Sequence, residues 1–127
     1  MLAENSYNEI GQLKGKGLSS GLQNTTYAYN ERGWLKSSTS AQFSMLLKYQ
    51  DGTTPQFNGN ISGQSWGAAS TLGSSFAYGY DKMNRLISGV GTGMSEISTY
   101  DQMGNISTLN RDGVTRTYVY VGNQVTN

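Results

Sequence analysis

The chain has 127 residues, 17 of them glycine, and a net charge of +1. This length suits one ordinary domain, and the absence of cysteine excludes disulfide bonds. Charged residues make up only 13% of the chain, so we expect no charged surface that would attract nucleic acid. No apolar run is long enough for a transmembrane helix, and no signal peptide is visible at the N-terminus.

One short pattern recurs along the chain, about every 20 residues. The four clearest copies are YNEIGQLKG, YNERGWLKS, YDKMNRLIS and YDQMGNIST, which begin at Tyr7, Tyr29, Tyr80 and Tyr100. A copy with a shorter bend begins at Tyr120. Another begins at Tyr49, where an insertion with Gly52 and Pro55 delays the ending GNIS. These six units predict a single repeat region over residues 1–127.

Each unit predicts a β-hairpin. Aromatic residues alternate before the bend, as in Tyr27-x-Tyr29, which indicates a strand with one buried face. Asn or Asp after the repeat tyrosine favours a turn, and Gly or Asn three residues later suits a left-handed backbone, with a bulge expected at the glycine. A second strand then starts at Leu or Ile. The predicted structural positions are Tyr7, Asn8, Gly11, Leu13, Tyr29, Asn30, Gly33, Leu35, Tyr80, Asp81, Asn84, Leu86, Tyr100, Asp101, Gly104, Ile106 and Tyr120.

The predicted fold is therefore all-β: tandem hairpins that form one extended, twisted antiparallel sheet of ten to twelve short strands. Segments rich in Gly and Ser, such as residues 70–75 and 89–93, are expected to be the connecting loops. The position before each Leu or Ile varies, and we expect it to face outward. It holds Gln12, Trp34, Arg85 and Asn105.

A lone hairpin is marginal in water, so neighbouring units must share contacts. The sequence starts and stops within the repeat pattern, and a long sheet leaves edge strands that can pair with other strands. We expect either a fragment of a longer array, bound to flanking repeats, or a subunit that associates with copies of itself.

Catalysis is not expected. The chain has no His and no Cys, which removes the commonest bases, nucleophiles and transition-metal ligands. The most suggestive carboxylates are Asp81 and Asp101, yet sister units hold Asn8 and Asn30 at the same position. Asn can form the same turn but cannot transfer a proton, so we predict a structural role, with no catalytic residue, no metal and no cofactor.

Carbohydrate binding is the alternative that the sequence leaves open. Trp34 and Trp66, together with nine tyrosines, offer ring faces on which a sugar can stack, with Asn and Ser alongside as hydrogen-bonding partners. The competing interpretation is that these rings form the buried face of the sheet.

The repeated motifs also resemble a known family. YNERGWLKS, YDKMNRLIS and YDQMGNIST resemble the YD repeat of the RHS (rearrangement hotspot) family, whose usual unit is Tyr-Asp-x-x-Gly-Arg-Leu. The resemblance covers residues 7–127, and the polar, Ser- and Gly-rich style is similar to RHS proteins of gut Bacteroidetes. It implies β-hairpin ribbons that spiral into a hollow shell, which encloses a C-terminal toxin in bacterial toxin systems and insecticidal toxin complexes. In animal teneurins a similar shell supports cell–cell adhesion.

What the resemblance implies for this chain is narrower. The family's core motif, with its Asp-Pro signature and self-cleaving acidic pair, is absent, since the only proline is Pro55. We therefore expect a non-catalytic structural or interaction module of a larger RHS-type scaffold, outside the cell or in the cell envelope. A carbohydrate-binding module and a partial shell for a toxin cargo are the alternatives.

Overall fold

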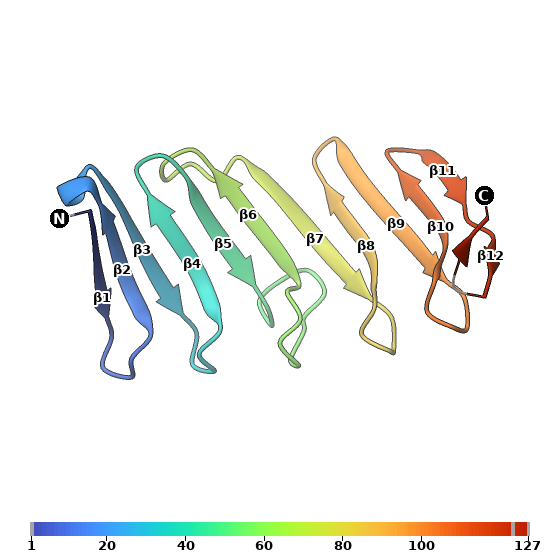
Figure 1. Cartoon of the computed structure of the whole chain (residues 1–127), viewed down its shortest axis with the longest axis horizontal. Coiled ribbons are helices and arrows are strands. Elements are labelled where there is room, and N and C mark those ends of the chain that lie inside the picture. The colour runs from blue at the N-terminus through green and yellow to red at the C-terminus, as the bar shows by residue number, and fades with distance from the viewer. Residues whose placement is uncertain (1, 123, 127) are drawn as a thin grey trace. The chain divides into compact units, whose positions relative to one another are not determined.

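The computed structural model describes residues 2–122 and 124–126 (Figure 1). The chain forms two compact units, Met1–Ser75 and Phe76–Asn127. In the first unit, six strands pair antiparallel in chain order, and a short 3-10 turn, Ser19–Gly21, links the second to the third. These strands are β1 (Ala3–Tyr7), β2 (Leu13–Leu18), β3 (Gln23–Tyr29), β4 (Leu35–Ser40), β5 (Ser44–Lys48) and β6 (Gly63–Gly67).

The second unit repeats this plan. Its strands β7 to β11 also pair antiparallel in chain order, and the last two strands form a separate ribbon. They are β7 (Ser74–Tyr80), which begins two residues before the unit does, β8 (Leu86–Gly91), β9 (Met94–Tyr100), β10 (Ile106–Arg111), β11 (Val114–Thr117), β12 (Tyr120–Val121) and β13 (Gln124–Val125). The all-β hairpin fold that the sequence predicts is confirmed. The described residues form thirteen strands because Tyr120 starts a short hairpin of its own.

The repeat pattern sets the register of each hairpin. In the four regular units the tyrosine ends the first strand and lies opposite the Leu or Ile that opens the second. Tyr120 instead opens β12 and lies opposite Val125, which ends β13. In the four regular units one extra residue follows that Leu or Ile, and it forms the bulge. The bulged residues are Lys14, Lys36, Ile87 and Ser107. The bulge thus lies in the return strand and not at the glycine, where the sequence placed it.

The glycine position has a different role. Gly11, Gly33 and Gly104 have φ angles of 80°, 79° and 88°, and Asn84 has a φ of 61°. This is the left-handed region, which Gly and Asn enter at the lowest cost.

The predicted glycine-rich loop at residues 89–93 is mostly wrong. Gly89, Val90 and Gly91 belong to β8, and only Thr92 and Gly93 connect it to β9. The ring of Tyr78 lies over Gly89, since a Cβ there would be 3.4 Å from the ring. The glycine leaves room for an aromatic side chain on the paired strand. At residues 70–75 the connection is also shorter than expected, because Ser74 and Ser75 start β7.

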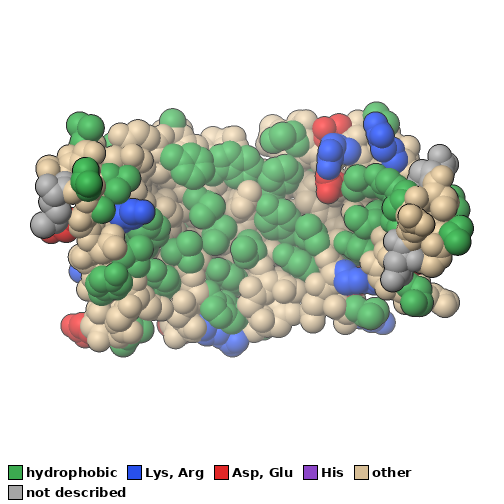
Figure 2. Space-filling view, in the orientation of Figure 1, with side chains coloured by type: hydrophobic (Ala, Val, Ile, Leu, Met, Phe, Trp, Pro, Cys, Tyr) green, Lys and Arg blue, Asp and Glu red, His purple; other side chains and the backbone are tan. Residues whose placement is uncertain are grey.

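The core is small. Among the described residues, Leu47 and Tyr49 are the only buried hydrophobic side chains, with exposed fractions of 8% and 7%. The alternating aromatics, such as Tyr27 and Tyr29, are half-buried instead of fully enclosed. In Figure 2, hydrophobic side chains lie side by side on the displayed face, with few charges between them. Within the described ranges no helix is long and apolar enough to cross a membrane.

Candidate functional site

The residues that recur in the repeat meet at the hairpin turns. The Oδ1 atom of the Asn or Asp after each tyrosine accepts hydrogen bonds of 2.8–3.2 Å from the backbone N–H groups two and four residues later. This holds at Asn8, Asn30, Asp81 and Asp101. The neutral amide and the carboxylate form the same turn because both offer one acceptor oxygen in the same place.

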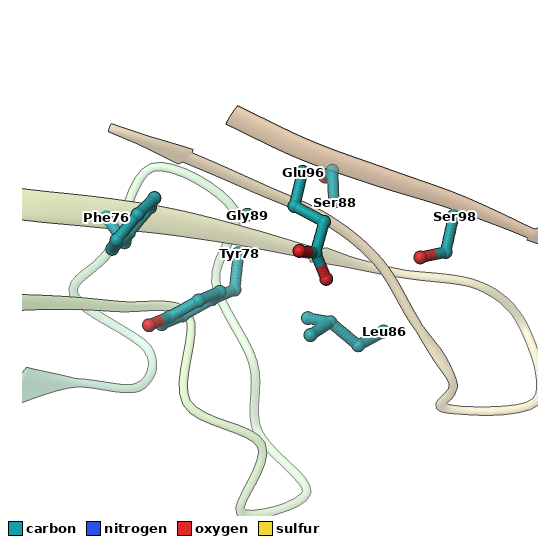
Figure 3. A pocket seen from close by; sticks show the side chains of 7 residues that line it. All are labelled: Phe76, Tyr78, Leu86, Ser88, Gly89, Glu96 and Ser98. Carbon is teal, nitrogen blue, oxygen red and sulfur yellow. The ribbon is translucent and has the colours of Figure 1, made fainter. Parts of the chain in front are cut away.

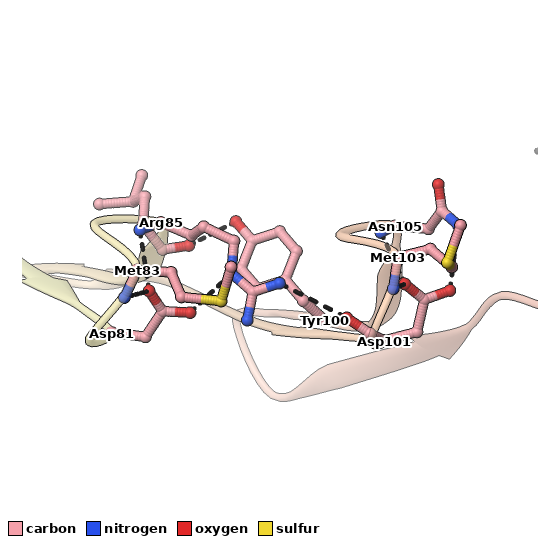
Figure 4. Close-up of polar contacts among 8 residues, drawn as sticks. Asp81, Met83, Arg85, Tyr100, Asp101, Met103 and Asn105 are labelled. Atoms are coloured by element: carbon pink, nitrogen blue, oxygen red, sulfur yellow. Dashed lines mark hydrogen bonds and ion pairs between the residues drawn. The ribbon is translucent and has the colours of Figure 1, made fainter.

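The second carboxylate oxygen of Asp81 and of Asp101 also accepts a hydrogen bond. Asp81 Oδ2 accepts from Arg85 Nε at 2.7 Å, and Asp101 Oδ2 accepts from Asn105 Nδ2 at 3.0 Å (Figure 4). The pKa of Asp81 is lowered, chiefly by the backbone N–H of Arg85 and further by its guanidinium. The pKa of Asp101 is lowered, chiefly by the Asn105 side chain. Both carboxylates are therefore held ionised as turn acceptors, which is the opposite of what a general acid requires.

The tyrosine hydroxyls join one hairpin to the previous one. Four of them donate to the backbone carbonyl of the Leu or Ile that opens the preceding return strand. The four pairs are Tyr29 to Leu13 at 2.9 Å, Tyr49 to Leu35 at 2.8 Å, Tyr100 to Leu86 at 2.6 Å and Tyr120 to Ile106 at 2.9 Å. We call this contact the tyrosine rung. Its donor and its acceptor are repeat positions, so every rung is built from the same two groups.

The variable position before Leu or Ile strengthens the contact between hairpins. Arg85 places its guanidinium over the ring of Tyr100, at 4.5 Å from the centroid, and donates to the Asp101 carbonyl at 3.4 Å (Figure 4). Gln12 Nε2 donates to the Gly33 carbonyl at 3.2 Å. The expectation that this position faces outward is wrong, because Gln12, Arg85 and their counterparts Trp34 and Asn105 are all half-buried. The sequence did hold a signal for these contacts, because this position carries side chains with hydrogen-bond donors and, in one unit, the large ring of Trp34.

Trp34 lies in a cluster formed with the insertion that follows Tyr49. Its ring centroid is 5.1 Å from that of Tyr49, and the Arg32 guanidinium lies 5.3 Å over it. Arg32 Nη1 also donates to the Phe57 carbonyl at 2.8 Å, and a Cβ at Gly59 would be 3.3 Å from the Trp34 ring. The delayed repeat thus folds back over Trp34, and a sugar would have to compete with these contacts.

Trp66, the second predicted stacking residue, lies within β6 opposite Met45 of β5. It is half-buried, whereas Trp34 lies directly before a different strand, β4. Sugar stacking on these two rings stays a prediction. Within residues 2–122 and 124–126, no group of three or more Asp or Glu side chains is placed to hold a metal ion.

Comparisons with known proteins extend the description of the fold. No protein-family model matches the chain, and no curated protein matches it. Solved structures do match, among them the crystal structure of TcdB2-TccC3-TEV, with a TM-score of 0.68 and 16% sequence identity over 84% of this chain. The matched region is 6% of the TcdB2-TccC3-TEV chain, so this chain spans a small part of that length. At this identity the likeness shows a shared fold.

Proposed function

We propose that the chain is a segment of an RHS-type YD-repeat array and acts as a non-catalytic structural scaffold. The observation that carries the proposal is the tyrosine rung, which joins successive hairpins in four places through the same donor and acceptor. The fold likeness to the TcdB2-TccC3 structure supports an array of this type. The turn contacts of Asp81 and Asp101 support a structural role for the carboxylates that most resemble a catalytic pair.

The partner that this scaffold fits is another hairpin of the same repeat, from flanking sequence or from a second copy of the chain. Strand β1 is exposed along all five residues and pairs on one side with β2. Tyr7 ends that strand, is 60% exposed, and has no hydrogen-bond partner for its hydroxyl among the described residues. In the other rungs this hydroxyl reaches the carbonyl of a preceding hairpin. Tyr7 is therefore the donor half of a rung whose acceptor comes from a partner hairpin.

Because the repeats resemble those of the RHS family, we propose that the scaffold functions outside the cell or in the cell envelope. A role in a shell around a toxin cargo would require many more hairpins than the chain supplies.

Self-association tests this proposal with the chain as it is. Sedimentation velocity over a concentration series is expected to show reversible association of the wild type. In Tyr7→Phe the association weakens, because the unpaired donor is lost, while the free energy of unfolding of the monomer is unchanged. Tyr27→Phe is the matched control, since within the described part of the chain its hydroxyl has no partner and β3 lies inside the sheet. A strict monomer at high concentration, or equal association of Tyr7→Phe and wild type, would contradict the proposal.

A further inference from the structure

Two strands have one edge without a partner strand. Among the described residues, β1 pairs only with β2, and β11 pairs only with β10. Every residue of both strands is exposed. Each strand carries one charged residue, Glu4 in β1 and Arg116 in β11. Within the part of the chain that the structure describes, neither side chain has an ion pair or a hydrogen bond. Both edges therefore offer free backbone groups and one free charge to another strand.

The backbone hydrogen bonds show which residues of each edge point outward. The Leu2 carbonyl accepts from Ser19 N–H at 3.0 Å, so the backbone groups of Leu2 point toward β2. Tyr118 N–H donates to the Ser107 carbonyl at 2.9 Å, so it points toward β10. The direction alternates from residue to residue along an antiparallel strand. The outward residues are thus Ala3 and Asn5 of β1, and Thr115 and Thr117 of β11.

These directions determine how the β1 edge of one copy would pair antiparallel with the β11 edge of another. The register that pairs all four outward residues places Glu4 directly opposite Arg116. The two charged residues then form a pair without backbone hydrogen bonds, in which side chains approach most closely. The flanking pairs are Ala3 with Thr117 and Asn5 with Thr115.

Charge favours this contact over the contact of two identical edges. Two β1 edges in the equivalent arrangement would place Glu4 opposite Glu4, and two β11 edges would place Arg116 opposite Arg116. Like charges directly opposite each other destabilise a strand pair, whereas opposite charges stabilise it. The sheet already contains one favourable pair of this kind. Glu96 of β9 (Figure 3) lies directly opposite Arg111 of β10, and its Oε2 accepts from Nε at 2.8 Å and from Nη2 at 2.6 Å.

We propose that the chain associates head to tail, with the β1 edge of one copy paired antiparallel to the β11 edge of a second copy. The proposal rests on the scaffold role proposed above and names the partner of Tyr7. In this register Tyr7 lies beside Val114, which opens the return strand β11. Leu13 opens β2 in the same way, and its carbonyl is the acceptor for Tyr29. Because the contact joins two different edges, an assembly keeps one free edge of each kind and can grow.

Reversal of the two charges tests the proposal by sedimentation velocity over a concentration series. Glu4→Arg and Arg116→Glu should each weaken association about tenfold, because like charges then meet. The double variant, which carries both changes, should associate like the wild type. Glu31→Arg is the matched control, since it reverses an exposed charge in the turn between β3 and β4, away from both edges. It should also associate like the wild type.

Engineered cysteines test the register, since the chain has no cysteine of its own. Mild oxidation of the Ala3→Cys, Thr117→Cys variant should give a ladder of disulfide-linked oligomers, because directly opposite residues lie within disulfide reach. The Asn5→Cys, Thr117→Cys variant has the same number of thiols, two positions out of register. It should cross-link far less, because diagonal neighbours lie about 7–8 Å apart.

The outcomes separate this proposal from the scaffold role. Association that both single charge reversals leave unchanged would overturn the head-to-tail contact and leave the scaffold role standing. A dimer that grows no further, or equal cross-linking of the two cysteine pairs, would do the same. A strict monomer at high concentration would contradict both proposals.

Discussion

At the scale of the residue, the Asn or Asp after each repeat tyrosine fills a role that needs no charge. Asn8 and Asn30 accept the same two backbone hydrogen bonds as Asp81 and Asp101. What differs is the donor that meets the second side-chain atom. Arg85 is a cation that can only donate, whereas an amide such as Asn105 can turn over and accept. Asn8 shows the alternative, because its Nδ2 donates to Gln12 Oε1 at 2.8 Å.

This difference predicts an order of stability for two conservative variants. Asp101→Asn should unfold at nearly the wild-type temperature, because Asn105 can present its oxygen to the new amide. Asp81→Asn should unfold at a lower temperature, because an N–H group then faces Arg85, which has no acceptor. Thermal unfolding followed by circular dichroism measures both. Equal loss in the two variants would show that the second side-chain contact does not matter.

The lowered pKa values of Asp81 and Asp101 predict how stability responds to acid. Because the folded pKa lies below the ordinary value of 3.8, the unfolded chain binds more protons in the interval between them. The stabilisation is therefore complete above that value and is lost as the pH falls through the folded pKa. Denaturation at pH 7 and at stepwise lower pH should show a loss that is smaller in the Asp81→Asn, Asp101→Asn double variant. An identical acid profile for both proteins would contradict this assignment.

At the scale of the element, each hairpin depends on one left-handed residue and one bulge. The turn glycine is required for its backbone angle, since a Cβ at Gly104 would meet nothing within 4 Å. The bulge after Leu or Ile brings the return strand back into register with the first strand. The repeat pattern therefore determines the turn and the bulge of each hairpin, independently of how the hairpins pack together.

The need for a left-handed backbone at the turn glycine predicts that variants at Gly104 lose stability to different degrees. Gly104→Ala should lower the free energy of unfolding by about 1 kcal/mol, the cost of a left-handed residue with a Cβ. Gly104→Asn should lose less, because Asn84 already adopts a φ of 61° in a sister turn. Chemical denaturation measures both, with Gly73→Ala as a control whose backbone is not left-handed. A Gly104→Ala variant as stable as Gly104→Asn would refute the conformational explanation.

At the scale of the whole molecule, the repeat pattern in the sequence predicted the local hairpins but did not predict the contacts between hairpins. Tyr-Asn/Asp-x-x-Gly/Asn predicted the hairpins because turn chemistry acts within five residues. It did not predict the rung between Tyr29 and Leu13, which are 16 residues apart and meet only after two strands pair. It also misplaced Gly89, since composition cannot tell a glycine in a loop from one that makes room for Tyr78 on the neighbouring strand.

These rungs explain how a sheet with so small a core holds its hairpins in order. Among the described residues few side chains are fully enclosed, so we expect the hydrogen bonds and ring contacts between successive hairpins to contribute a large share of the stability. A sheet built in this way can be lengthened by adding units, because each added repeat tyrosine would find its acceptor in the unit before it.

The free energy of unfolding across a tyrosine series tests this central claim most directly. Tyr29→Phe, Tyr49→Phe, Tyr100→Phe and Tyr120→Phe each remove one rung hydroxyl and leave a carbonyl without its donor. Each should lose about 1 kcal/mol in chemical denaturation. Tyr27→Phe removes a hydroxyl that has no partner among the described residues, and it should match the wild type. Losses at all four rung positions and none at Tyr27 are the predicted result. Four rung variants as stable as wild type, or an equal loss at Tyr27, would contradict the account.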